Sequence, residues 1–122
     1  MLTCLTLAAA IATAQQVTDQ IMGMNSGDTL EINADCLKAL TLSGFQPAAL
    51  TTIRLLGRYF RVRLNNCHNL RLEISEAWEG ALEGSGRPIY LSECQNVEIV
   101  NTRVTFARKG LIAVNCTNLT LS

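Results

Sequence analysis

One seven-residue pattern recurs three times in the second half of the chain. It reads NCHNLRL at residues 66–72, ECQNVEI at residues 93–99 and NCTNLTL at residues 115–121. In each copy an asparagine stands two positions after the cysteine, and apolar residues stand three and five positions after it. Alternating apolar residues also precede each cysteine, so every copy predicts a strand, a tight turn and a second strand.

A weaker copy of the pattern, DCLKALT at residues 35–41, extends the series of cysteines toward the N-terminus. The four cysteines concerned, at successive intervals of 31, 27 and 22 residues, are Cys36, Cys67, Cys94 and Cys116. No Cys-x-x-Cys pair is present, which is the spacing of zinc ribbons and thioredoxin-like motifs. We therefore interpret the four as equivalent interior positions where a thiol acts as a small hydrophobe. The sequence predicts no metal site and no cofactor.

A repeat of this length is typical of a solenoid, in which stacked units share one core. A leucine-rich repeat would place a helix or tight turn after one short strand. Here residues 70–74 (LRLEI) alternate strictly, and a strand is predicted before each cysteine as well. Two or three strands in each unit predict an all-β fold, a short parallel β-helix of about three to four coils.

The repeat resembles the right-handed parallel β-helix superfamily, the pectate-lyase-like architecture. Three asparagines share one offset, as in the asparagine ladder of that fold: Asn69, Asn96 and Asn118. Asparagine tolerates a left-handed backbone, and its amide can bond to stacked neighbours. Residues 27–32 (GDTLEI) look like the start of a first coil in that architecture, and residues 87–101 read like its usual repeat. The resemblance implies a right-handed solenoid whose open end is closed by a helix.

The chain of 122 residues is expected to form one domain. Residues 1–24 are expected to form the capping helix, because apolar residues between Leu7 and Ile21 are spaced three and four apart. The coils are expected over residues 28–122.

The two ends of the chain leave alternatives open. Residues 1–14 (MLTCLTLAAAIATA) end like a signal peptide, but they lack the basic residues that normally begin one. They are too short to span a membrane. The last predicted strand reaches Leu121, which would leave an uncovered strand edge and an open apolar core. We expect either a fragment of a longer solenoid or a second subunit that covers this end.

Charge excludes two classes of partner. Lys plus Arg and Asp plus Glu both number 10, so the net charge is zero with His68 neutral. No overall positive field would attract nucleic acid or an anionic membrane, and neither is predicted as a partner. At 48% hydrophobic and 16% charged residues, the chain should fold.

The alternation also predicts which side chains point outward. Two outward columns are expected, one of Arg63, Tyr90 and Ile112, the other of Arg71, Glu98 and Thr120.

Three residues are candidates for carbohydrate binding. Arg54 and Arg103 are expected to point outward from a third face, where enzymes similar to this fold keep their sites. Their guanidinium groups could pair with an anionic sugar. Trp78 stands in the longest insertion, residues 75–87, and could stack on a sugar ring. Each residue also has a purely structural interpretation, as a solvated strand residue or as packing against the next coil.

No complete catalytic set is recognisable, so the catalytic residues stay unknown and enzymatic activity stays uncertain. The first hypothesis is a non-catalytic β-helix module for carbohydrate recognition or for assembly within a larger or oligomeric protein. Its partners would be a polysaccharide, further copies or further coils. The alternative is the N-terminal part of a polysaccharide lyase or glycoside hydrolase, with its catalytic coils beyond residue 122. Secreted, virion-surface, cell-surface and cytoplasmic locations all stay open.

Overall fold

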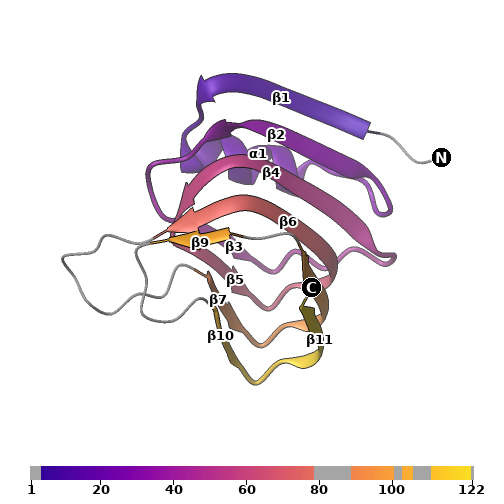
Figure 1. Ribbon diagram of the computed structural model, residues 1–122. Coiled ribbons are helices and arrows are strands. Elements are labelled where there is room, and N and C mark those ends of the chain that lie inside the picture. The colour runs from indigo at the N-terminus through magenta and orange to yellow at the C-terminus, as the bar shows by residue number, and fades with distance from the viewer. Residues whose placement is uncertain (1–3, 79–88, 101–102, 106–110, 122) are drawn as a thin grey trace.

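The computed structural model describes residues 4–78, 89–100, 103–105 and 111–121, and its strands form two parallel sheets (Figure 1). Sheet A contains, in spatial order, β1 (Cys4–Ile11), β2 (Thr29–Asp35), β4 (Thr51–Phe60), β6 (His68–Trp78), β8 (Gln95–Val100) and β11 (Thr117–Leu121), and β9 (Arg103–Thr105) also pairs with β6. Sheet B contains β10 (Leu111–Val114), β7 (Ile89–Ser92), β5 (Val62–Asn65) and β3 (Leu40–Ser43). One helix, α1 (Ala14–Met22), lies among the described residues.

Neighbouring strands of each sheet come from successive coils of the chain. β3 and β4 form the first coil, β5 and β6 the second, and β7, β8 and β9 the third; β10 and β11 begin a fourth. Each strand pairs in parallel with its counterpart in the next coil. This parallel solenoid of about three turns confirms the predicted parallel β-helix.

Sheet A bends within its longest strands, which gives the solenoid a third wall. The pairing of β4 with β6 shifts register between Leu55 and Arg58. Beyond this shift, β6 pairs with β9 instead of β8. At the bend a Cβ on Gly57 would lie 2.3 Å from the carbonyl oxygen of Ala34 in the preceding coil. The close approach of the two backbones therefore requires glycine here.

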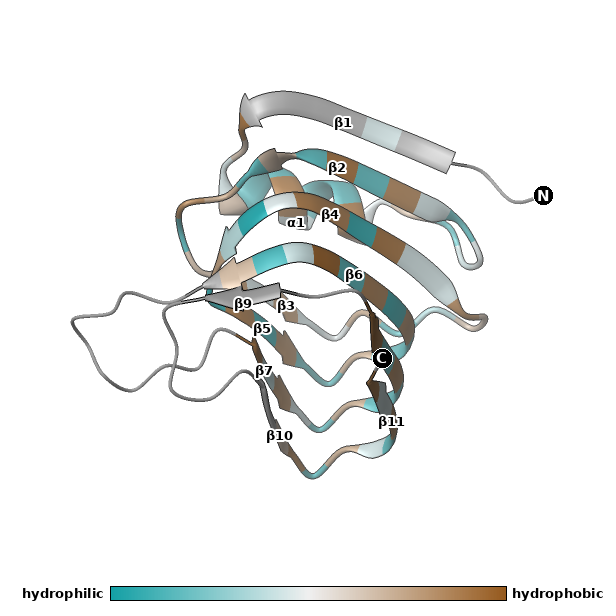
Figure 2. Cartoon of the chain, in the orientation of Figure 1, coloured by the Kyte–Doolittle hydropathy of each residue, from teal (hydrophilic) through white to brown (hydrophobic). Residues whose placement is uncertain are grey.

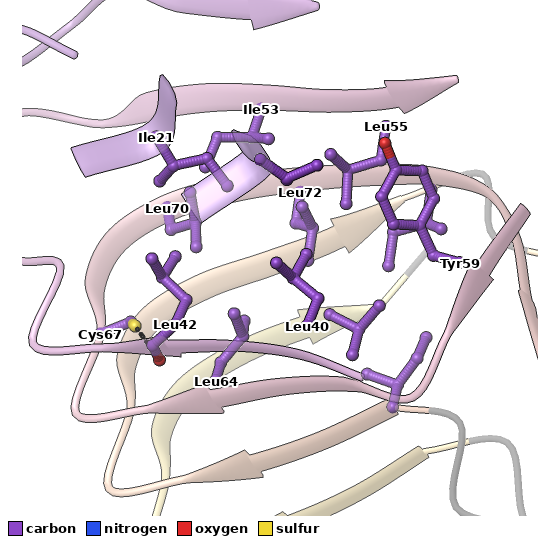
Figure 3. Close-up of a cluster of buried hydrophobic side chains, with 14 of the residues drawn as sticks. Ile21, Leu40, Leu42, Ile53, Leu55, Tyr59, Leu64, Cys67, Leu70 and Leu72 are labelled. Atoms are coloured by element: carbon purple, nitrogen blue, oxygen red, sulfur yellow. Dashed lines mark hydrogen bonds between the residues drawn. The ribbon is translucent and has the colours of Figure 1, made fainter. Parts of the chain in front are cut away.

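The core lies between the two sheets and is built by alternation. In β4 the side chains of Ile53 and Leu55 are fully buried, whereas Thr52 and Arg54 between them are partly exposed. Figure 2 shows this alternation of hydrophobic and hydrophilic residues along β4 and β6. Leucines of sheet B meet the inner side chains of sheet A in the close-up of Figure 3. Burial of these apolar side chains is the main favourable contribution to folding.

The predicted helix over residues 1–24 is wrong in its first half. Residues Cys4–Ile11 form β1, which pairs in parallel with β2. The helix begins only at Ala14, because Thr13 provides a capping box: its side chain accepts from the backbone N–H of Gln16, and the Gln16 side chain accepts from the backbone N–H of Thr13. The preceding apolar run instead satisfies its backbone groups on the edge of β2.

The shorter helix nevertheless covers the end of the core, as expected of a cap. α1 contacts β3 and β2. Its two buried residues, Val17 and Ile21, belong to the common core. Figure 3 shows Ile21 among the inner side chains of sheet A, near Ile53 and Leu70. The helix therefore covers the N-terminal end of the core where sheet B stops at β3.

Cys36 is not equivalent to the other three cysteines, contrary to the sequence interpretation. It forms an isolated parallel bridge with Tyr59 on the third wall. The position of Cys67 in the first coil is taken by Phe45, whose carbonyl oxygen accepts from the N–H of His68 at 3.0 Å. The next two coils repeat this bond, from Gln95 to Cys67 and from Thr117 to Cys94. The interior column is therefore Phe45, Cys67, Cys94 and Cys116.

Tyr59 provides a test of the packing. Its side chain is fully buried, and its hydroxyl has no hydrogen-bond partner among the described residues. Burial, with Cys36 and Asp35 nearby, raises its pKa, so the hydroxyl stays neutral. Tyr59→Phe should raise the free energy of unfolding by about 1 kcal/mol, because an unpaired polar group leaves the core. Denaturant unfolding measures this change.

The matched control is Tyr90→Phe, at a partly exposed tyrosine on β7. It should change the free energy of unfolding by less than about 0.5 kcal/mol. A clear loss of stability in Tyr59→Phe alone would show that the hydroxyl has a partner in solution.

Candidate functional site

The tight turns between the two sheets carry a ladder of asparagine side chains. Asn118 Nδ2 donates to Asn96 Oδ1 at 3.0 Å, and Asn96 Nδ2 donates to Asn69 Oδ1 at 2.8 Å. Asn69 Nδ2 ends the series by donating to the carbonyl oxygen of Pro47 at 2.8 Å. All three asparagines have a positive φ, between 52° and 57°. The ladder therefore links four successive coils, in one direction of donation.

A second column of left-handed residues stands three positions before the ladder. It consists of Gly44, Asn66, Glu93 and Asn115, with φ values of 72°, 55°, 57° and 53°. Asn115 Nδ2 donates to Glu93 Oε1 at 3.0 Å. Donation again runs from the later coil to the earlier one. These positions belong to the repeated sequence pattern. Their left-handed conformation was not predicted, because glutamate, the residue at position 93, rarely has a positive φ.

The thiols of Cys67 and Cys94 lie between these two columns and inside the core. Both residues are fully buried, and their sulfurs lie within hydrogen-bond distance of carbonyl oxygens of the preceding coil, those of Leu42 at 3.4 Å and Leu64 at 3.6 Å. The hydrogen bond between the two thiols, together with burial, raises the pKa of Cys67. Cys116 is only partly buried. The cysteines thus form an interior column that is fully buried at Cys67 and Cys94 and partly exposed at Cys116.

Arg54 points outward from sheet A, where its guanidinium group is engaged by two carboxylates. Arg54 Nη1 lies 2.6 Å from Glu31 Oε2, and Arg54 Nε lies 3.0 Å from Glu73 Oε2. The three residues are partners in register on β2, β4 and β6. They form a charged column in which the positive charge of Arg54 is already balanced within the protein.

The structure does not bring Arg54 and Arg103 together on one face. Arg54 is in register with Glu73, before the bend, whereas Arg103 is in register with Glu76, beyond it. Glu76 also receives an ion pair from Arg58, with Nε and Oε2 3.0 Å apart. The expected common face fails because the register shift separates the two positions.

Trp78 lies at the end of β6, in register with Thr105 of β9. The expected insertion therefore begins only after Trp78, and residues 79–88 lie outside the described residues. Trp78 is thus near Arg103 along the third wall and distant from Arg54. The side chains of Trp78 and Arg103 are also outside the description.

The strand register confirms that the residues of both predicted columns align. Arg63, Tyr90 and Ile112 align in sheet B, and Arg71, Glu98 and Thr120 align in sheet A. The guanidinium carbon of Arg63 lies 5.7 Å from the centre of the Tyr90 ring. This cation–π contact was missed, since sequence spacing gives the column but not the rotamers.

Among the described residues, no group of three or more His, Cys, Asp or Glu side chains is placed to hold a metal ion. The helix that the structure describes is not long and apolar enough to cross a membrane. Comparison with protein-family models, with curated proteins and with solved structures gave no match. The structure itself therefore defines the class of the protein, a parallel β-solenoid.

The ladder can be tested at its central member. Asn96→Gly keeps the positive φ without strain but removes the hydrogen bonds to Asn69 and Asn118. We expect the free energy of unfolding to fall by about 1–2 kcal/mol, because two hydrogen bonds are lost. Asn25→Gly, at an exposed turn residue, is the control and should change it by less than about 0.5 kcal/mol. Equal effects of the two substitutions would contradict a stabilising ladder.

The charged column makes a second prediction. Arg54→Gln should lower the free energy of unfolding by about 0.5–1 kcal/mol at low ionic strength, and by less in about 0.5 M salt. Arg71→Gln is the matched control. It should lower the free energy of unfolding by less, because Arg71 Nε lies 3.8 Å from Glu98 Oε2 and this ion pair is weaker. Thermal unfolding of both variants at the two salt concentrations measures the difference. A loss that does not depend on salt would mean that packing, not charge, is what Arg54 contributes.

Proposed function

We propose that the chain is a non-catalytic β-helix module that acts in assembly. Its working surface is the edge formed by β10 and β11, which we call the open edge. This edge adds a further parallel coil. The same architecture and the asparagine ladder support placing the chain in the pectate-lyase-like superfamily.

The observation that carries the proposal is a change of burial along one interior column. Ile53, Leu72, Ile99 and Leu121 are in register on β4, β6, β8 and β11. The first three are at most 4% exposed, whereas Leu121 is 58% exposed. The position is buried wherever a later coil lies over it. A covering coil would therefore remove most of the Leu121 side chain from water.

The backbone of the open edge repeats groups that bind a coil elsewhere in the solenoid. The N–H groups of Asn66 and Glu93 donate to carbonyl oxygens of the following coil, at Ser92 and Val114. Asn115 is the equivalent residue at the open edge, and its N–H has no following coil among the described residues. Unpaired strand edges of this kind are sites of strand addition.

A second copy of this chain does not fit the open edge as a parallel coil. In the N-terminal half, α1 covers the core beside β3, where a strand of sheet B would have to pair. A copy could therefore continue sheet A through β1 but could not continue sheet B. This argues against a second copy as the source of the added coil.

Assembly is better supported than carbohydrate recognition. The guanidinium group of Arg54 is held between Glu31 and Glu73, which would compete with an anionic sugar. Arg103 lies on another wall. Nothing in the described residues favours the alternative of a lyase or hydrolase over an assembly module.

The test is strand addition by a defined peptide. The probe is a fluorescein-labelled peptide with the sequence of residues 111–121, LIAVNCTNLTL, with alanine in place of its cysteine. We expect it to bind the full chain, as measured by fluorescence anisotropy. Leu121→Lys in the protein should weaken binding by about tenfold, because an apolar contact at the open edge is lost.

The control is Leu37→Lys, at a leucine of similar exposure, 52%, that lies between β2 and β3. It should leave peptide binding unchanged. Light scattering of the full chain without peptide completes the test. A dimer that Leu121→Lys abolishes would identify a second copy as the source of the added coil. Absence of peptide binding would overturn the proposal.

A further inference from the structure

The interior column places two thiols of successive coils in direct contact. Cys67 and Cys94 are both fully buried, and a hydrogen bond joins their sulfurs. We propose that this pair is a redox-sensitive modification site, at which a hydroperoxide forms a disulfide between the second and third coils. Both coils lie between other described coils, so the pair belongs to the body of the solenoid.

The two sulfurs have the same surroundings, one coil apart. Each lies 3.4–3.6 Å from two carbonyl oxygens, one in the preceding coil and one two residues earlier in its own coil. Figure 3 shows the first of these contacts for Cys67, with the carbonyl oxygen of Leu42. The two side chains therefore point in the same direction, and the sulfur of Cys94 lies over that of Cys67.

The backbones bring the pair within the range of a disulfide. The N–H of Gln95 donates to the carbonyl oxygen of Cys67 at 3.0 Å, and His68 is in register with Gln95. Cys67 and Cys94 thus occupy equivalent positions one strand spacing apart, about 4.8 Å. Disulfides join residues whose Cα atoms are about 4.4–6.8 Å apart. The bond can therefore form without a change in strand register.

The hydrogen bond between the sulfurs makes the two residues chemically different. It lowers the pKa of Cys94 and raises the pKa of Cys67. Because the thiolate is the form that reacts with oxidants, Cys94 is the sulfur that reacts first. Cys67 keeps its proton and is the second thiol. Cys94 also has a hydrogen bond with Cys116, but this bond changes the pKa of Cys94 least, so Cys67 is the preferred partner.

The reaction needs one molecule of a hydroperoxide, of which hydrogen peroxide is the smallest. The sulfur of Cys94 attacks one peroxide oxygen, the O–O bond breaks, and a sulfenic acid and one water form. The sulfur of Cys67 then attacks the sulfur of Cys94, the S–O bond breaks, and a second water leaves with the Cys67 proton. Two thiols are oxidised to one disulfide, and one hydrogen peroxide is reduced to two waters. Because hydrogen peroxide is small and uncharged, a local opening of the coils admits it where bulky thiol reagents stay excluded.

The test is a map of the disulfides formed in the folded protein. The reduced full chain is treated with hydrogen peroxide, remaining thiols are blocked with N-ethylmaleimide in denaturant, and the protein is digested with trypsin without reduction. Trypsin places Cys67 in the peptide 64–71 and Cys94 in the peptide 72–103, because it does not cut before Pro88. We expect a cross-link between these two peptides that is about tenfold more abundant than any other, since the sulfurs are held in contact.

Cys36 is the matched control, since it is as buried as the pair but stands outside the column. It should be recovered with N-ethylmaleimide attached. Recovery of Cys67 and Cys94 in the same blocked form would overturn the proposal. A cross-link that forms only in denaturant, or that joins Cys94 mainly to Cys116, would overturn it as well.

A second measurement follows the effect of the cross-link on the folded protein. Peroxide should raise the midpoint of thermal unfolding by about 10 °C, because the disulfide restricts the unfolded chain, and a thiol reductant should reverse the rise. Cys94→Ser should show no rise, and it also controls for oxidation of methionine. An equal rise in wild-type protein and Cys94→Ser would contradict a disulfide as the cause.

Discussion

The structure depends on a left-handed backbone bend that is repeated in each coil. In the second, third and fourth coils two residues with positive φ, three positions apart, turn the chain from sheet B into sheet A, and at the bend of the first coil Gly44 alone has a positive φ. Because most residues other than asparagine and glycine resist this conformation, the bend favours asparagine at these positions, with Glu93 as an exception. The asparagine amides then meet their counterparts in adjacent coils, so the residue that permits the bend also holds the stack in register. Strand pairing, the thiol column and the core alternation all follow from this register.

The repeated parts of the fold were predictable because each copy of the pattern supports the others. Asn69, Asn96 and Asn118 share one offset, and the ladder they form needs no information beyond that spacing. The outward columns follow from alternation in the same way. Physical regularity between neighbouring coils thus appears directly as periodicity in the sequence.

The sequence predictions were wrong where a tertiary contact interrupts the repeat. The strand over Cys4–Ile11 pairs with the edge of β2, a tertiary contact that overrides a helical spacing of apolar residues. Cys36 resembles the other cysteines in its local sequence, yet Gly44 and Phe45 occupy the bend and the interior position of that coil. The register shift after Leu55 likewise separates Arg54 from Arg103. The predictions of candidate site residues were the least accurate, because the sequence repeat does not reveal side-chain ion pairs such as those of Arg54.

The cap formed by α1 closes the core on the N-terminal side of the first coil. Equivalent interior residues of successive coils, such as Cys94 and Cys116, are 22 residues apart in sequence. The surface on which a coil pairs is therefore always made of residues that precede it in the chain. During synthesis on a ribosome, the capped first coil emerges first and each later coil meets a finished edge. The order in which the chain is made is thus the order in which its coils can stack, and no coil has to wait for a partner that has not yet been synthesised.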